Sequence, residues 1–205
     1  MSISESASER DLKLQQFNEF FSIENEFNVN LIPLDADQVP DYNTFMERIP
    51  LPFKISSDIS TVDQAALRPI QGLSGVASHL VEFLNHQAQK IDLLVGYILS
   101  QQDDEKYRYQ GVKFGGGGII FASPEQFDTH QMLEMKMFFL QDHCAVFCLG
   151  EIIDVERRQD TNHYKVIFHY IRDEDRELLV RTSLHEQSKQ LQLLAQQRNK
   201  QSSGQ

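Results

Sequence analysis

Four consecutive glycines, residues 115–118, lie between two segments whose composition is typical of β-strands. Glycine-rich loops can bind phosphate, because their backbone amides approach an anion closely. A Walker-type loop, however, continues into Lys-Ser or Lys-Thr at the start of a helix, and a dinucleotide-binding loop also opens a helix. Here Ile119 and Ile120 follow and continue a strand. By itself, the glycine run therefore indicates a strand-to-strand turn or a close backbone approach.

The other groups that could support catalysis or metal binding lack a recognised spacing. His79 and His86 lie seven residues apart on one predicted helical face, without a third ligand. His185 opens the sequence HEQSK, which lacks the second histidine of a zinc-protease helix. Cys144 and Cys148 share one face of a predicted strand, which favours buried thiols over a metal site. No Gly-x-Ser-x-Gly motif is present. We therefore predict a protein that is not an enzyme and has no metal site.

The composition restricts the class of partner. The chain has 205 residues, a formal net charge of −11 and a pI near 5.0. This charge argues against binding to a nucleic acid polymer, which needs clustered lysine and arginine, and against anionic membrane surfaces. No run of about 18 apolar residues is present, so no membrane insertion is expected. The polar, acidic start of the chain does not resemble a secretory signal, and two cysteines provide no disulfide framework, so we predict a cytoplasmic protein.

Strand-like segments dominate the second half of the chain. Residues 26–32 alternate strictly between apolar and polar, and five further segments are strand-like: 107–114, 119–122, 131–140, 144–155 and 164–171. Short polar connections join the later ones, which suggests a small antiparallel β-barrel. The segment from Arg172 closes the chain as a helix with acidic residues in its first turn. The predicted fold class is α+β: one domain over residues 13–199, with a disordered start at 1–12 and a frayed tail at 200–205.

A heptad pattern identifies a long helix inserted into this domain, within a helical region of about residues 58–102. Alternating spacings of four and three place Ala77, Leu84, Ile91 and Ile98 at position a, and Leu73, Leu80, Gln87 and Leu94 at position d. The helix is predicted over about residues 72–100. Its stripe could pack on the chain's own barrel, but a helix of this length exceeds what one face of a small barrel covers. We therefore expect a homo-oligomer, with dimer and tetramer both left open.

The order of the β segments resembles the PilZ domain family. The resemblance rests on FGGGGIIFASPEQF from Phe114, QMLEMKMFF from Gln131, and the sequence from Cys144 through RDEDRELLVR. In that family a strand reads Gly-Gly-aliphatic-x-Phe after the motif loop, as Gly117–Phe121 does here. The resemblance implies a small barrel closed by a C-terminal helix, and a role as receptor for the bacterial second messenger cyclic di-GMP. The inserted heptad helix resembles the atypical, tetramer-forming branch of the family.

The family's two ligand motifs are degenerate in this sequence. Nucleotide-binding members carry Arg-x-x-x-Arg before the first strand, and the matching positions here are Asn18 and Ser22. Neutral side chains there cannot clamp phosphate or stack on guanine as arginine does. In the second motif, Asp/Asn-x-Ser-x-x-Gly, Lys113 replaces the acid, Gly115 replaces the serine, and only Gly118 is retained. The resemblance therefore implies a signalling or adaptor protein that contacts an unknown partner protein, with cyclic di-GMP binding lost or weak.

Two further interpretations concern the basic residues. Arg172 and Arg176 have the Arg-x-x-x-Arg spacing, but they lie at the start of the last helix with acidic residues between them, so we do not assign them to the ligand motif. The alternative function is a genuine cyclic di-GMP receptor with an unconventional site. The charge for such a site could come from Arg68, Arg108, Lys113 or the pair Arg157 and Arg158.

Overall fold

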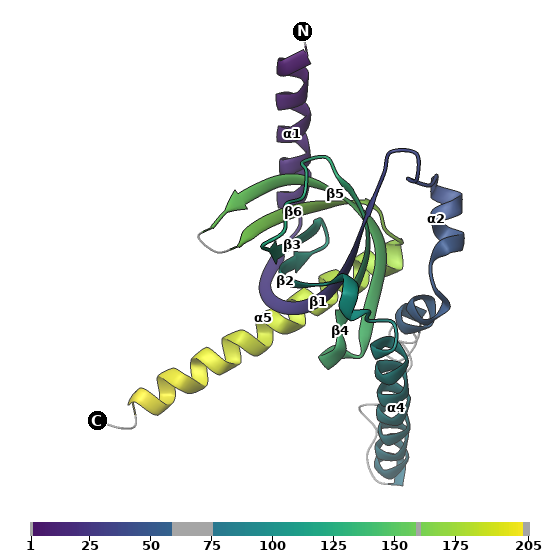
Figure 1. Cartoon of the computed structure of the whole chain (residues 1–205). Helices are drawn as coiled ribbons and strands as arrows, with labels where there is room; N and C mark the ends of the chain where they lie inside the picture. The colour runs from purple at the N-terminus through teal and green to yellow at the C-terminus, as the bar shows by residue number, and fades with distance from the viewer. Residues whose placement is uncertain (1, 59–75, 159–160, 203–205) are drawn as a thin grey trace.

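The structure is a computed structural model that describes residues 2–58, 76–158 and 161–202 (Figure 1). Six antiparallel strands form a closed barrel in the order β1-β2-β3-β6-β5-β4, which confirms the predicted fold class. The strands are β1 (Ser22–Leu34), β2 (Arg108–Gly115), β3 (Gly118–Ser123), β4 (Met132–Phe139), β5 (Cys144–Arg157) and β6 (Asn162–Tyr170).

Alternating apolar side chains fill the barrel. In β4, Leu133, Met135 and Met137 are fully buried, whereas Glu134 and Lys136 between them remain partly exposed. This period of two arises because successive side chains of a strand point to opposite faces of the sheet. The alternation in the sequence therefore identifies the face of each strand that lines the core.

The two cysteines belong to this core, as their spacing predicted. Burial raises the pKa of the Cys144 thiol to about 12 and raises the pKa of Cys148 well above its usual value. A thiol must ionise to act as a nucleophile or a metal ligand. Both cysteines therefore serve as packing groups.

Helices surround the barrel and extend from it in different directions (Figure 1). They are α1 (Ser2–Glu19), α2 (Tyr42–Arg48), a helical segment at 51–58, α4 (Val76–Ser100) and α5 (Asp173–Ser202). Residues 2–12, for which disorder was predicted, lie in α1, and Arg10 and Lys13 of this helix form ion pairs with β5. Among the described residues, no helix is both long enough and apolar enough to span a membrane.

A second apolar cluster lies between the barrel and the helices that follow β1. Val95 and Leu99 of α4 pack there with Phe45 of α2, with Phe53, and with Phe147 of β5. Within the described part of the chain, Val95 and Leu99 are the buried apolar residues of α4. The helix therefore uses one narrow stripe near its C-terminal end to contact its own barrel.

The predicted heptad positions lie largely off that stripe. Their exposed fractions are 60% for Leu80, 40% for Leu84, 45% for Ile91, 64% for Leu94 and 47% for Ile98, while Gln87 is half-buried. Leu73 lies outside the described residues, and for Ala77 the structure describes the helical backbone. The long apolar stripe is thus not the contact between α4 and its own barrel.

Candidate ligand site at the glycine hairpin

The glycine run forms the tight hairpin between β2 and β3. Gly115 pairs with Gly118 across the hairpin, and residues 116–117 make the turn. The carbonyl of Gly117 accepts a hydrogen bond of 3.2 Å from the amide of Phe168 in β6. The run is therefore a strand-to-strand turn, as the sequence taken alone indicated, and no helix follows it.

The backbone around the hairpin leaves no room for side chains. A Cβ atom at Gly115 would lie 2.2 Å from the carbonyl oxygen of Phe21. A Cβ atom at Gly118 would lie 2.0 Å from the carbonyl oxygen of Val166 and 2.9 Å from the ring of Phe17. Distances below about 3 Å are not tolerated in packed interiors, so glycine is required at both positions. The glycines allow the end of α1 and the start of β1 to pack directly on the hairpin.

Two aromatic residues of this junction cover the glycines. Phe17 is 4% exposed, and its ring lies against Gly118. Phe20 lies over Gly116, where a Cβ atom would approach its ring to 2.6 Å. Cations face both rings: Nζ of Lys165 is 5.5 Å from the centroid of Phe17, and the guanidinium of Arg176 is 5.3 Å from that of Phe20. The hairpin is thus enclosed by aromatic and cationic side chains of the chain itself.

Arg176 also holds the turn directly. Its Nη1 donates a hydrogen bond to the carbonyl oxygen of Gly116. From the sequence, neither Arg176 nor Arg172 was assigned to the ligand motif, because both lie at the start of the last helix with acidic residues between them. Arg176 nevertheless lies at the hairpin, because the first turn of α5 lies beside it. Arg172 is instead buried, and its Nε and Nη2 each donate to the carboxylate of Asp175 at 2.8 Å.

The structure brings four of the predicted site residues together. Ser22 is the residue opposite Gly115 in the β1–β2 pair, so the predicted arginine position and the predicted serine position are neighbours. Gly118 completes the hairpin beneath Phe17. Asn18 is exposed and follows Phe17 directly in α1. The two degenerate motifs therefore meet at one place, although their positions are nearly 100 residues apart in the chain.

The other two predicted residues lie elsewhere. Arg108 starts β2, at the opposite end of that strand from the hairpin, and its Nε contacts both carboxylate oxygens of Asp103 at 2.9 and 3.0 Å. Lys113 is opposite Glu24 in the β1–β2 pair and lines a separate cavity. The length of β2 separates Arg108 from the glycines, whereas Lys113 lies two residues before Gly115.

The cavity beside Lys113 has a volume of about 170 Å³ and a mixed lining. Arg158 and His163 border it, but so do Glu24 and Glu156. Arg158 lies 3.3 Å from Glu156, and burial, helped by the charge of Arg158, lowers the pKa of His163. The histidine is therefore neutral at pH 7, and the two carboxylates offset the two remaining cations.

Ion pairs attach α1 to the barrel near the hairpin. Arg10 contacts Asp154 of β5 at 2.6 Å, and Nζ of Lys13 contacts Glu151 of β5 at 2.9 Å. Nζ of Lys165 lies 3.8 Å from the same Asp154. These contacts, together with Phe17, fix the end of α1 over the glycines. Phe17, Lys165 and the role of Arg176 were not predicted from the sequence, in which the spacing from Arg172 to Arg176 was the one available signal.

Comparison with known proteins agrees with this architecture. The profile of the PilZ domain matches residues 81–184, about half of the chain. A search of curated proteins gives no significant match. Among solved structures, the chain is similar to a tetrameric PilZ domain protein of Xanthomonas campestris, self-assembled via an unusual helical bundle, at 14% identity and a TM-score of 0.54. That alignment covers 88% of this chain and 98% of the Xanthomonas chain. The inhibitor of motility MotI/DgrA of Bacillus subtilis aligns at 7% identity and a TM-score of 0.45, over 83% of this chain and 51% of that one.

Proposed function

We propose, from the premise that this chain belongs to the PilZ domain family, that it is a non-enzymatic signalling adaptor of a cyclic di-GMP pathway. It acts by contacting a partner protein and assembles through the exposed stripe of α4. At the position where the family usually binds cyclic di-GMP, it binds the nucleotide weakly or not at all. The observation that carries the proposal is the junction of α1 and β1, where the residues from Phe17 to Ser22 cover the glycine hairpin with no arginine among them.

The loss of affinity follows from the chemistry of the missing groups. A guanidinium makes bidentate contacts to phosphate and stacks on a base, which the side chains of Asn18 and Ser22 cannot do. Each hydrogen bond to a charged group contributes about 1.5–3 kcal/mol, so the absence of two arginines costs several powers of ten in affinity.

The cations that do lie at the hairpin have partners within the chain. Arg176 donates to the carbonyl of Gly116 and stacks over Phe20, and Lys165 lies between Asp154 and the ring of Phe17. A nucleotide would have to displace Phe17, which is buried, before it reached the glycines. The site is therefore closed by packing as well as depleted of arginine.

Self-association is supported by the exposure of the heptad positions. Five apolar side chains at these positions are at least 40% exposed, and such a continuous apolar stripe on a helix is typical of an interface. The Xanthomonas protein with a similar fold is described as tetrameric through a helical bundle. We therefore propose that α4 forms a helical bundle between copies of this chain.

Calorimetric titration of the full chain with cyclic di-GMP tests the nucleotide part of this proposal. We expect no heat of binding at micromolar nucleotide, and the same result with GTP as a control for general phosphate binding. Binding of cyclic di-GMP at sub-micromolar Kd would contradict the proposal.

The second candidate function is a cyclic di-GMP receptor that uses the cavity beside Lys113. The observation in its favour is the presence of Lys113 and Arg158 in one cavity. Arg68, another candidate, lies outside the described residues. If this function is correct, cyclic di-GMP raises the melting temperature and Lys113→Ala abolishes the shift. Under our proposal, cyclic di-GMP leaves the melting temperature unchanged in both the wild type and Lys113→Ala, because Glu24 and Glu156 oppose an anionic ligand.

A further inference from the structure

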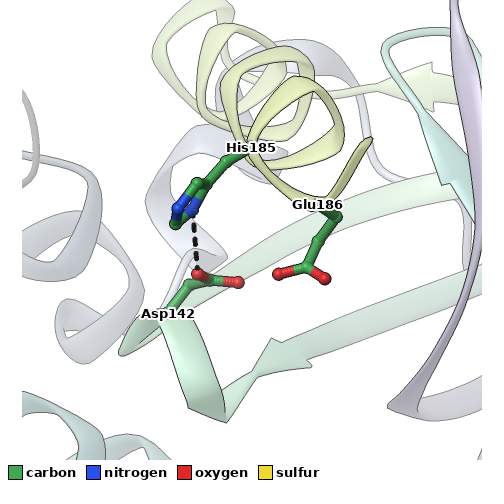
Figure 2. Close-up of side chains that lie close together, drawn as sticks. All are labelled: Asp142, His185 and Glu186. Carbon is green, nitrogen blue, oxygen red and sulfur yellow. Dashed lines mark ion pairs between the residues drawn. The ribbon is translucent and has the colours of Figure 1, made fainter. Parts of the chain in front are cut away.

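A second cluster of ionisable side chains lies where the β4–β5 turn meets α5 (Figure 2). Asp142 ends the short helix η2 (Leu140–Asp142), and His185 and Glu186 are neighbours on α5. One ligand atom from each of the three residues can be chosen so that all lie within 4.8 Å of one another. Figure 2 shows the carboxylates of Asp142 and Glu186 pointing toward each other, with the His185 ring facing Asp142. The fold thus brings an imidazole and two carboxylates close together.

The distance between His185 and Asp142 is longer than an optimal hydrogen bond and is compatible with two ligands of one shared ion. Nδ1 of His185 lies 3.4 Å from Oδ1 of Asp142. Hydrogen bonds from N–H to oxygen are commonly about 2.9–3.0 Å long. Two ligands at about 2.0–2.2 Å from one tetrahedral zinc ion are separated by about 3.4 Å. The pair is therefore spaced as two corners of a tetrahedral metal site.

A cation already lies between the two carboxylates. Nζ of Lys189 is 2.5 Å from Oε1 of Glu186 and 3.4 Å from Oδ1 of Asp142. Two carboxylates and one ammonium leave one negative charge uncompensated, whereas a divalent ion balances both carboxylates. The Lys189 side chain is 39% exposed and can extend into solvent when an ion takes its place.

The surroundings provide both a fixed frame and room for water. Glu186 is 8% exposed, so its carboxylate is held within the packed surface. The His185 side chain is 61% exposed, so a metal ion can reach the site from solvent. A cavity of about 160 Å³ borders Asp142 and Glu186. Three protein ligands leave at least one coordination position, which a water molecule in this cavity can fill.

We propose that Asp142, His185 and Glu186 bind a divalent transition-metal ion of the zinc class, which displaces the ammonium of Lys189 and links η2 to α5. An imidazole with two carboxylates selects such an ion over Mg²⁺ or Ca²⁺, which prefer all-oxygen sites. This proposal departs from the sequence-based expectation of no metal site. Asp142 and His185 lie 43 positions apart in the sequence, so their spacing gave no signal, and the fold brings them together. The proposed metal site shares no residue with the glycine hairpin, so a test of one proposal does not decide the other.

Zinc titration of the full chain, produced without a polyhistidine tag and freed of metal by a chelator, tests the site. Competition with a chromophoric chelator measures the affinity. We expect one ion per chain at micromolar Kd, with Mg²⁺ failing to compete. His185→Ala and Asp142→Asn each weaken zinc binding by at least about 10-fold. His79→Ala, which removes an exposed histidine of α4, leaves the affinity unchanged.

Lys189→Met provides the sharper test. It keeps an apolar stem but removes the competing ammonium, so zinc affinity rises several-fold. Circular dichroism confirms that each variant keeps its fold, which is expected at His185 because its side chain is largely exposed. The proposal is overturned by a wild-type Kd weaker than about 100 μM, by equal effects of His185→Ala and His79→Ala, or by a loss of affinity in Lys189→Met.

Discussion

At Gly118 the barrel has no space for even one methyl group. A Cβ atom there would lie 2.0 Å from the carbonyl oxygen of Val166, which belongs to the β6 backbone and cannot rotate away. We expect Gly118→Ala to lower the free energy of unfolding by about 3 kcal/mol or more, because the strand pair must separate to admit the new carbon. Urea denaturation followed by circular dichroism measures this loss.

Gly96→Ala is the matched control for that substitution. Its new Cβ atom would meet Nδ1 of His143 at 2.7 Å, which is part of a side chain that can turn aside. Gly96 also lies within α4, where alanine is favoured over glycine by about 0.5–1 kcal/mol. If Gly96→Ala destabilises the protein as much as Gly118→Ala does, the clash with the β6 backbone is not the cause.

Tyr109 makes the free energy of unfolding depend on pH in the alkaline range. Burial, helped by a 2.6 Å hydrogen bond from its hydroxyl to Glu125, raises the pKa of Tyr109 to about 12, against about 10 in an unfolded chain. The folded protein therefore retains this proton more strongly, so the stabilisation is fully present below pH 10 and is lost as the pH rises toward 12. We expect Tyr109→Phe to flatten that part of the stability profile. Tyr97→Phe, at a residue that is 66% exposed, is the control and should leave the wild-type profile unchanged.

At the scale of elements, Phe17 determines whether α1 remains on the barrel. The helix is otherwise attached by two ion pairs, an exposed one from Arg10 and a partly buried one from Lys13, and surface ion pairs usually contribute about 1 kcal/mol or less. We expect Phe17→Ala to cost about 3 kcal/mol of stability and to expose residues 2–19 to proteases. Denaturation and limited proteolysis measure the two effects.

Phe21→Ala removes the same atoms from a side chain that is 44% exposed, next to the same hairpin. It should cost less than about 1 kcal/mol and leave α1 protected. Equal proteolysis of the two variants would mean that Phe17 does not anchor the helix.

The elements also indicate what the sequence could and could not predict. The barrel strands were predictable because their buried side chains repeat with a period of two, and α4 was predictable because its apolar side chains, although largely exposed in a single chain, repeat with a heptad pattern. The helix α1 was not, because its partners Asp154 and Glu151 lie more than 130 residues away and its own apolar pattern is weak. The same holds at the glycine hairpin, where Arg176 reaches Gly116 from a different element.

At the scale of the whole molecule, a single chain leaves much of α4 without apolar contacts. Within the described residues, the apolar heptad side chains of α4, here called the seam, are exposed, while Val95 and Leu99 hold the helix to the barrel; the seam side chains are Leu80, Leu84, Ile91, Leu94 and Ile98. The net charge of −11 opposes association, so an assembly must gain enough from apolar burial to offset this repulsion. Each fully buried leucine contributes about 1.5–3 kcal/mol, which several seam positions in two or more chains supply together.

Leu84→Asp therefore separates assembly from folding. Leu84 is 40% exposed at a central seam position, so a carboxylate there is solvated in the monomer but is buried without a partner in a helical bundle. Light scattering should report an oligomer for the wild type and a monomer for Leu84→Asp at the same concentration, and Leu80→Asp should act alike. Because the barrel core does not contain Leu84, the variant should keep the circular dichroism spectrum of the folded chain. Asn85→Asp adds the same charge one residue away from the seam and should remain oligomeric; if it also dissociates, charge repulsion and not the apolar seam controls the assembly.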